Sequence, residues 1–176
     1  MLAVLVPYVG PRRPEVEAGV PAWAEWVDVS ADGHAYWRTM CEWWERGESF
    51  LVVEHDVVCR PDVLEAVEAC PEPWCTHPYT PICHWECQEA WANMLGCTRF
   101  SASLIAACPQ AVSSIPVEQR LWNNLCDSIA GNKIGGVDQP TLRPHSLRAA
   151  GYSHHWHFPA VRHRSWETET VTVGAE

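Results

Sequence analysis

The stretch FLVVEHDVVC, residues 50–59, joins the pattern of a buried strand to a group of ionisable side chains. Four apolar residues run directly into Glu54, His55 and Asp56, and the apolar pattern resumes at Val57. A short, continuous apolar run is typical of a strand that is buried on both faces of a parallel sheet. We therefore predict a core strand over 49–58 that carries two acids and an imidazole near its carboxyl end.

Strand-like and helix-like segments alternate on both sides of this stretch. Apolar runs predict strands over 2–9 and 24–30, with a loop between them. Amphipathic spacing predicts helices over 34–47, where Gly47 would end the helix, and over 60–70. This alternation predicts an α/β fold, with a mostly parallel, Rossmann-like sheet flanked by helices.

The second half of the chain continues the pattern after a long excursion rich in proline, cysteine and tryptophan. A strand is predicted to turn into a helix near Ser101, and 116–131 predicts an amphipathic helix closed by Gly131. We expect one small domain over 1–165, followed by a polar, mobile C-terminal tail over 166–176.

The composition is that of a globular domain, and it excludes two classes of partner. Of 176 residues, 47% are hydrophobic and 19% are charged, and the formal net charge is −10. This charge argues against binding to a nucleic-acid backbone, which needs a basic surface. No apolar run is long enough to span a membrane, and the start lacks the order of a signal peptide, so we expect a cytoplasmic protein. Its nine cysteines are then expected to be reduced.

The two acids are the first candidate site. Side chains alternate along a strand, so Glu54 and Asp56 are predicted to share one side while His55 points to the other. Ligands of open α/β sheets bind beyond the carboxyl ends of the strands. A divalent cation would offset the cost of placing two carboxylates there, and oxygen ligands favour Mg²⁺ or Mn²⁺ shared with nucleotide phosphates. The alternative is that the acids pair with Arg60, Arg99 or another arginine and do no chemistry.

An N-terminal apolar strand, a second strand ending in Asp28, a helix with YW and then FLVVEHDV resemble, in this order, the nucleotide-binding half of a GT-A glycosyltransferase. The chain is similar in particular to small glycosyltransferase-like proteins encoded by bacteriophages of actinobacteria, over residues 1 to about 163. The resemblance implies a metal-dependent enzyme that moves a sugar from a nucleoside-diphosphate sugar to an acceptor hydroxyl on a glycan, protein or small molecule. A phage-encoded enzyme would act in the host cytoplasm. EHD would be this chain's version of the family's Asp-x-Asp motif, with Glu54 in place of the first aspartate.

The resemblance also implies roles for individual residues. Asp56 would be the direct metal ligand, and Glu54 would contact the ribose, the sugar or a metal-bound water. A C-terminal histidine would complete the metal site, and we favour His163 over His157; such a shell favours Mn²⁺ over Mg²⁺. The base and ribose would contact Pro7, Tyr8 and Val9 at the end of the first strand. The base would also contact Asp28, and Arg99 would lie near the phosphates. A structural role for the arginine is the alternative.

A catalytic base is needed only if the enzyme inverts the configuration of the sugar. Glu118 is then the first candidate, because the family's base often begins a helix after a strand of the GCTRFS type. Asp127 and Asp138 are the weaker candidates, and an ordinary charge at a helix N-terminus is the other interpretation of Glu118. The sequence leaves inverting and retaining mechanisms open.

Two further interpretations compete with glycosyl transfer. A non-catalytic module could hold a structural Zn²⁺ between residues 75 and 87, through Cys75, His77, Cys83, His84 and Cys87. A nucleotidyltransferase also joins a parallel sheet to acids and a metal. Enzymes of that class usually carry a glycine-rich phosphate loop, whereas PYVGPRRP has a single glycine.

Overall fold

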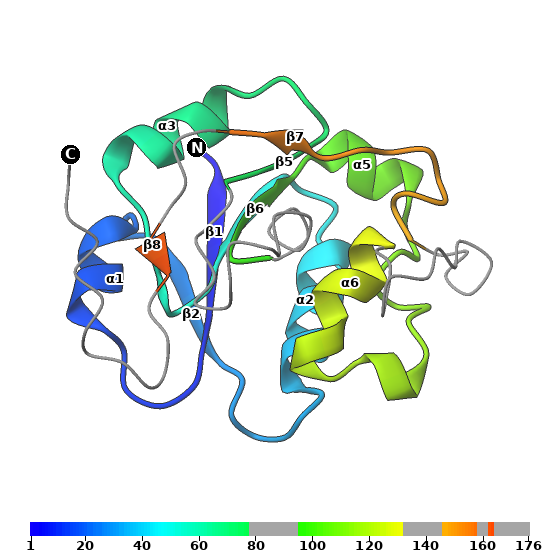
Figure 1. The fold of residues 1–176 in the computed structure, drawn as a ribbon, viewed down its shortest axis with the longest axis horizontal. Helices are drawn as coiled ribbons and strands as arrows, with labels where there is room; N and C mark the ends of the chain where they lie inside the picture. Colours follow the sequence, from blue (N-terminus) through cyan, green and yellow to red (C-terminus); the bar gives the residue numbers. More distant parts are fainter. Residues whose placement is uncertain (78–94, 132–145, 158–161, 164–176) are drawn as a thin grey trace, which may run out of the picture.

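The computed structural model describes residues 1–77, 95–131, 146–157 and 162–163 (Figure 1). They form a mixed α/β domain around a six-stranded sheet with the order β2-β1-β3-β6-β5-β7, and a second sheet pairs β4 with β8. The strands are β1 Ala3–Tyr8, β2 Glu25–Asp28, β3 Phe50–Val53, β4 Val57–Val58, β5 Trp74–Thr76, β6 Cys97–Phe100, β7 His155–Trp156 and β8 Arg162–His163. The helices are α1 Pro14–Gly19, α2 Ala35–Glu45, α3 Pro61–Ala69, α5 Ala102–Ala107, the 3₁₀ helix η1 Val117–Gln119 and α6 Trp122–Ala130.

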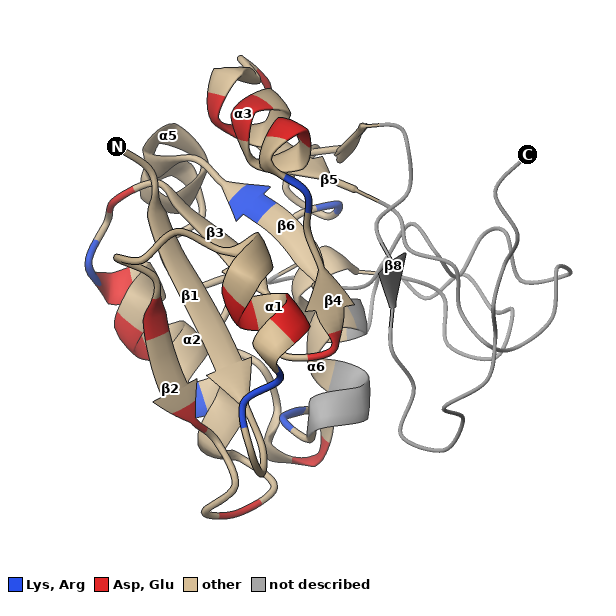
Figure 2. Ribbon diagram, turned by 90° about the vertical axis from the view of Figure 1, so that its left-hand side faces the viewer, with Lys and Arg blue, Asp and Glu red and all other residues tan. Residues whose placement is uncertain are grey.

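The connections between the first three strands define the centre of the sheet. β1 pairs in parallel with β2 on one side and with β3 on the other. The chain therefore moves outward from β1 to β2 and then returns across β1 to begin β3. Figure 2 shows α1 in front of the sheet and α2 behind it, so the two connections cover opposite faces. Beyond β3, the strand β6 runs antiparallel, β5 is antiparallel to β6, and β7 is parallel to β5.

Each face of the sheet packs against its own hydrophobic core. Alternate residues of β3 belong to different cores, with Phe50 on the α2 side and Leu51 on the α3 side. On the α2 side, the rings of Trp43 and Trp44 lie 5.4 and 6.3 Å from that of Phe50, and Trp44 lies 5.2 Å from Phe100. These two tryptophans are buried packing residues, which accounts for part of the tryptophan excess by core formation.

Several predicted elements are confirmed, together with the residues that end or begin them. The predicted strands over 2–9 and 24–30 are β1 and β2, and the predicted helix over 34–47 is α2. Gly47 follows α2 with φ of 70°, a left-handed conformation that glycine adopts without steric cost. Ser101 caps α5, because its hydroxyl accepts a hydrogen bond of 3.2 Å from the Leu104 N–H.

The predicted core strand over 49–58 is wrong in its length. β3 ends at Val53, and Glu54, His55 and Asp56 form a turn that is closed by a 2.9 Å hydrogen bond from Val57 N–H to the Glu54 carbonyl. Period-two alternation therefore does not apply to the acids, and their side-chain directions do not follow from the strand. We call Glu54–Asp56 the acid turn.

Two other expectations also need correction. The loop predicted between the first two strands contains α1. This helix packs closely against the backbone after β4, since a Cβ on Gly19 would lie 2.4 Å from the Cys59 carbonyl oxygen. The predicted helix over 116–131 is divided into η1 and α6, although it ends at Gly131 as expected.

The tail over 166–176 lies outside the described residues. Within the described part of the chain, every helix is too short or too polar to cross a bilayer.

Candidate functional site

The acid turn is buried at the carboxyl end of β3. Glu54, His55 and Asp56 are 9%, 2% and 7% exposed. Glu54 Oε1 accepts a 3.2 Å hydrogen bond from the hydroxyl of Tyr36, which comes from the first turn of α2. The Glu54 N–H donates to the Gly96 carbonyl at 3.0 Å, just before β6. Glu54 is therefore held by α2 through its side chain and by the sheet through its backbone.

The end of β1 lies at the same edge of the sheet. β1 and β3 pair in register up to Leu5 and Val52, and the same register two residues further brings Pro7 level with Glu54. Since the chain leaves β1 toward β2 and returns to β3, this point is the topological switch point of the sheet. Ligands of open α/β folds bind outside the carboxyl ends of the strands at such a point.

The end of β2 adds an ionised carboxylate to this edge. Asp28 pairs with Tyr8 in the sheet, and its Oδ1 accepts a 2.9 Å hydrogen bond from the Ser30 N–H. Hydrogen bonds donated by Ser30, first from its side chain and then from its backbone N–H, lower the pKa of Asp28. The guanidinium of Arg12 lies 5.2 Å from the centre of the Tyr8 ring and 4.9 Å from that of Trp26. The predicted residues Pro7, Tyr8, Val9 and Asp28 therefore come together with the acid turn along one edge.

The C-terminal segment returns to the acid turn. β8 pairs antiparallel with β4, and His163 lies directly opposite Val57. Because Val57 follows Asp56 in the chain, the backbone of His163 runs beside the exit of the acid turn. Of the two histidines predicted as metal ligands, His163 is the one whose backbone reaches this turn.

His157 and Arg99 lie elsewhere, on the part of the sheet formed by β5, β6 and β7. The His157 N–H donates to the Thr76 carbonyl at 2.9 Å, and its ring stacks on His77 with centres 5.0 Å apart. Arg99 Nη1 donates to the carbonyls of Cys70 and Glu72, at 3.3 and 3.0 Å. Two strands separate β3 from β7, which corresponds to about 14 Å at the usual strand spacing. The structure thus separates His157 from the acids. Arg99 lies on the strand next to β3, where it pairs with Leu51, and its guanidinium binds the backbone carbonyls after α3.

Glu118 is exposed in η1, and its neighbours lead back toward α2. The Arg120 guanidinium lies 3.8 Å from the centre of the Trp37 ring, next to Tyr36 in the first turn of α2. The segment that carries Glu118 therefore flanks the helix that holds Glu54. Of the weaker candidates for the base, the side chain of Asp127 and all of Asp138 lie outside the described residues.

The arginines named as alternative partners of the acids have other partners. Arg60 donates two hydrogen bonds to Asp62, at 3.0 and 2.7 Å, and Arg99 bonds to backbone carbonyls. A structural role for Arg99 fits this arrangement.

A cysteine and histidine group occupies the α3 side of the sheet. One ligand atom each from Cys70, Cys75 and His157 lie within 4.8 Å of one another. Burial raises the pKa of the Cys75 thiol to about 12, with a further contribution from Cys70. Burial, followed by the neighbouring His77 and His155, lowers the pKa of His157. The sequence pattern pointed to Cys75 and His77 but missed Cys70 and His157, and the other predicted zinc ligands, Cys83, His84 and Cys87, lie outside the described residues.

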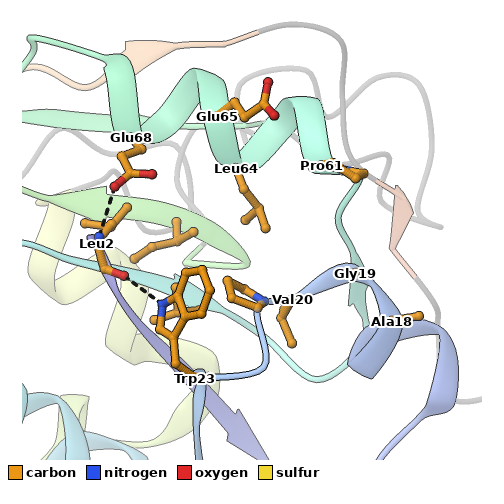
Figure 3. A pocket seen from close by; sticks show the side chains of 12 residues that line it. Leu2, Ala18, Gly19, Val20, Trp23, Pro61, Leu64, Glu65 and Glu68 are labelled. Carbon is orange, nitrogen blue, oxygen red and sulfur yellow. Dashed lines mark hydrogen bonds between the residues drawn. The ribbon is translucent and has the colours of Figure 1, made fainter.

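An apolar cavity of about 330 Å³ lies at the opposite edge of the sheet (Figure 3). Leu2 and Trp23 line it from the amino ends of β1 and β2, and Leu64 lines it from α3. Its charged lining residues are Glu65 and Glu68, and Glu68 accepts a 3.1 Å hydrogen bond from the Leu2 N–H. These carboxylates would repel a phosphate, and the cavity is remote from the acid turn.

Similarity to other proteins gives no assignment for either group of residues. No protein-family model, curated protein or solved structure matches the chain. The acid turn itself combines two buried acids, the Tyr36 hydroxyl and the backbone of the strand that carries His163 at the carboxyl end of the sheet.

Proposed function

We propose that the protein is a metal-dependent glycosyltransferase of the GT-A type, which binds a nucleoside-diphosphate sugar at the carboxyl edge of the sheet. The observation that carries the proposal is the buried acid turn at the switch point between β1 and β3, with the backbone of His163 opposite Val57. A cation at the acid turn would bridge the carboxylates there and the phosphates of a ligand, which carry charges of the same sign.

The residues at the acid turn fit a divalent cation. Asp56 is 7% exposed, and a buried carboxylate is stabilised by coordination to a metal. Asp56 and His163 would hold the ion, and a mixed carboxylate and imidazole shell suits Mn²⁺. Glu54 has a different role, because it already accepts a hydrogen bond from Tyr36 and so orients the turn. When bound, the ion supplies positive charge next to the leaving diphosphate, where negative charge develops.

The neighbouring strand ends suit the nucleoside. Tyr8 offers a half-buried ring, and Arg12 beside it brings a positive charge to the same edge. Asp28 is exposed and ionised, so it accepts hydrogen bonds from a base or a ribose hydroxyl. If the reaction inverts, Glu118 takes the proton of the acceptor hydroxyl, and a retaining reaction leaves it without that role.

Thermal unfolding with nucleotides tests the proposal. Mn²⁺ together with UDP or GDP is expected to raise the melting temperature of the wild type. A ligand at 100 times its Kd adds about 2.7 kcal/mol to the free energy of unfolding. Asp56→Asn is expected to lose this rise. Asp62→Asn is the matched control, because Asp62 is an exposed acid whose partner is Arg60. An equal rise in Asp56→Asn, or none with any nucleoside diphosphate in the wild type, contradicts the proposal.

Analysis of the products separates glycosyl transfer from nucleotidyl transfer. Incubation with nucleotide-sugars and Mn²⁺ is expected to release a nucleoside diphosphate, either by transfer to an acceptor or by slow hydrolysis. Release of pyrophosphate from a nucleoside triphosphate and a sugar phosphate would instead assign a nucleotidyltransferase.

A further inference from the structure

The group formed by Cys70, Cys75 and His157 has the donor chemistry and the spacing of a metal site. Two thiols and an imidazole within 4.8 Å of one another need movements of about 1 Å to reach the ligand separations of a tetrahedral zinc centre. Both cysteines are buried, and neither forms a disulfide. His157 Nε2 is buried and has no hydrogen-bond partner among the described residues. A buried imidazole nitrogen of this kind needs a partner, and a metal ion is one.

A fourth donor lies beside this group. His155 Nδ1 is 3.5 Å from Cys70 Sγ. Zn–S bonds of about 2.3 Å and Zn–N bonds of about 2.0 Å place tetrahedral sulfur and nitrogen ligands about 3.5 Å apart. His155 pairs with Cys75 in the sheet, so it also lies beside the second thiol on the neighbouring strand.

The fold fixes these donors through three separate elements. Cys70 is the C-cap of α3, Cys75 is the middle residue of β5, and His155 begins β7. Hydrogen bonds from Arg99 to the carbonyls of Cys70 and Glu72 hold the turn between the two cysteines. The donors therefore converge because the backbone is held, and not through a flexible loop.

We propose that Cys70, Cys75, His155 and His157 bind a structural Zn²⁺ ion. Binding displaces the protons of the two thiols to solvent, because the thiolate is the form that coordinates the metal. Arg99 supports the thiolates, since it pairs with Cys75 in the sheet and its buried Nε has no partner among the described residues. An N–H group directed at a coordinating sulfur is a common second interaction of zinc sites.

The ion would attach the last strand of the sheet to its neighbour β5. β7 has two residues and pairs with β5 through two residue pairs, so its hydrogen bonds alone hold it weakly. Zinc would join β7 to β5 and to the end of α3. Five residues, 157–161, separate β7 from β8. A zinc ion that fixes β7 would therefore also restrict the position of β8, the strand that reaches the acid turn.

Metal analysis of the purified protein tests the site. The wild type, purified under reducing conditions without added metal, is expected to contain about one Zn²⁺ per chain, as measured by inductively coupled plasma mass spectrometry. Cys75→Ser and His157→Asn are expected to lose most of it. Cys41→Ser is the control, because Cys41 is a free cysteine on α2, on the other side of the sheet. Equal zinc in Cys75→Ser and Cys41→Ser overturns the proposal.

A measurement on the unchanged chain covers the case in which a variant fails to fold. Co²⁺ added to metal-depleted wild type is expected to give thiolate-to-metal charge-transfer absorption and the visible bands of a tetrahedral site. Octahedral spectra, or a Cys70–Cys75 disulfide in protein that holds no zinc, overturn the site. Neither experiment uses a nucleotide, so zinc binding can fail while the glycosyltransferase proposal stands, and the reverse also holds.

Discussion

The hydrogen bond from the Tyr36 hydroxyl to Glu54 Oε1 links α2 to the acid turn. Glu54 is 9% exposed and Tyr36 is 1% exposed, so water does not readily replace this interaction. Hydrogen bonds to charged groups contribute more than those between neutral groups, because an unsatisfied buried charge is costly. The tyrosine hydroxyl is therefore a stability determinant and a positioning group at the same time.

Removal of this hydroxyl tests that role. Tyr36→Phe is expected to lower the free energy of unfolding by about 1.5–3 kcal/mol, because a buried carboxylate loses a donor. Urea unfolding at neutral pH measures the change. Tyr152→Phe is the control, since Tyr152 is only half-buried and is expected to change stability by less than about 0.5 kcal/mol. Equal effects of the two substitutions would show that the bond to Glu54 contributes no special stability.

At the scale of elements, long segments were predictable and short ones were not. The predictions for β1, β2, α2 and α3 hold because their apolar runs and their helix ends are local signals. β5 has three residues, all buried, and β7 has two, which is too few for a period to appear. α1 was missed because it has six residues, of which only Val16 and Gly19 are buried. These elements exist because the rest of the sheet supplies their partners.

The packing of α1 against the exit of β4 gives a prediction for Gly19. Gly19→Ala is expected to destabilise the protein by about 1–3 kcal/mol, since its Cβ would meet the Cys59 carbonyl at 2.4 Å and the backbone has to shift. Denaturant unfolding measures this, with the adjacent, exposed Ala18→Ser as the control. Gly19→Ala is also expected to reduce the rise in melting temperature with Mn²⁺ and nucleotide, because β4 follows the acid turn. Unchanged stability would mean that α1 adjusts freely.

The ion pair between β2 and the end of α2 gives a pH dependence. Arg46 donates two hydrogen bonds of 3.0 Å to Glu25, and these bonds lower the pKa of Glu25 below 4.5. Because the folded-state pKa is the lower one, the stabilisation is fully present above about pH 4.5 and is lost as the pH falls through the folded-state value. Both side chains are more than one third exposed, so the contribution stays below about 1 kcal/mol.

Comparison of two glutamine variants measures this contribution. Glu25→Gln is expected to be less stable than the wild type at pH 7, and the difference should shrink at strongly acidic pH. Glu65→Gln removes an exposed acid of α3 and is expected to follow the wild-type pH profile. A pH-independent difference for Glu25→Gln would exclude ionisation as its cause.

At the scale of the whole molecule, the antiparallel strand β6 decides which residues meet. It lies between β3 and β5, so Cys75, His155 and His157 gather two or three strands away from the acid turn. The sequence predicted the grouping of Tyr8, Asp28 and Glu54, because a rule about parallel strand ends applies to adjacent strands. It did not predict the grouping of Cys70 with His157, since pairing between segments 80 residues apart leaves no local pattern.

The two borders of the six-stranded sheet also differ from its interior. β2 forms one border with four residues and has exposed acids, Glu25 and Asp28, at its two ends, and β7 forms the other border with two residues. A strand from a second molecule that docked on β2 would have to desolvate carboxylates, and one that docked on β7 would gain few backbone bonds. Both borders therefore resist self-association into extended fibrils, even though the central strands β1 and β3 are apolar.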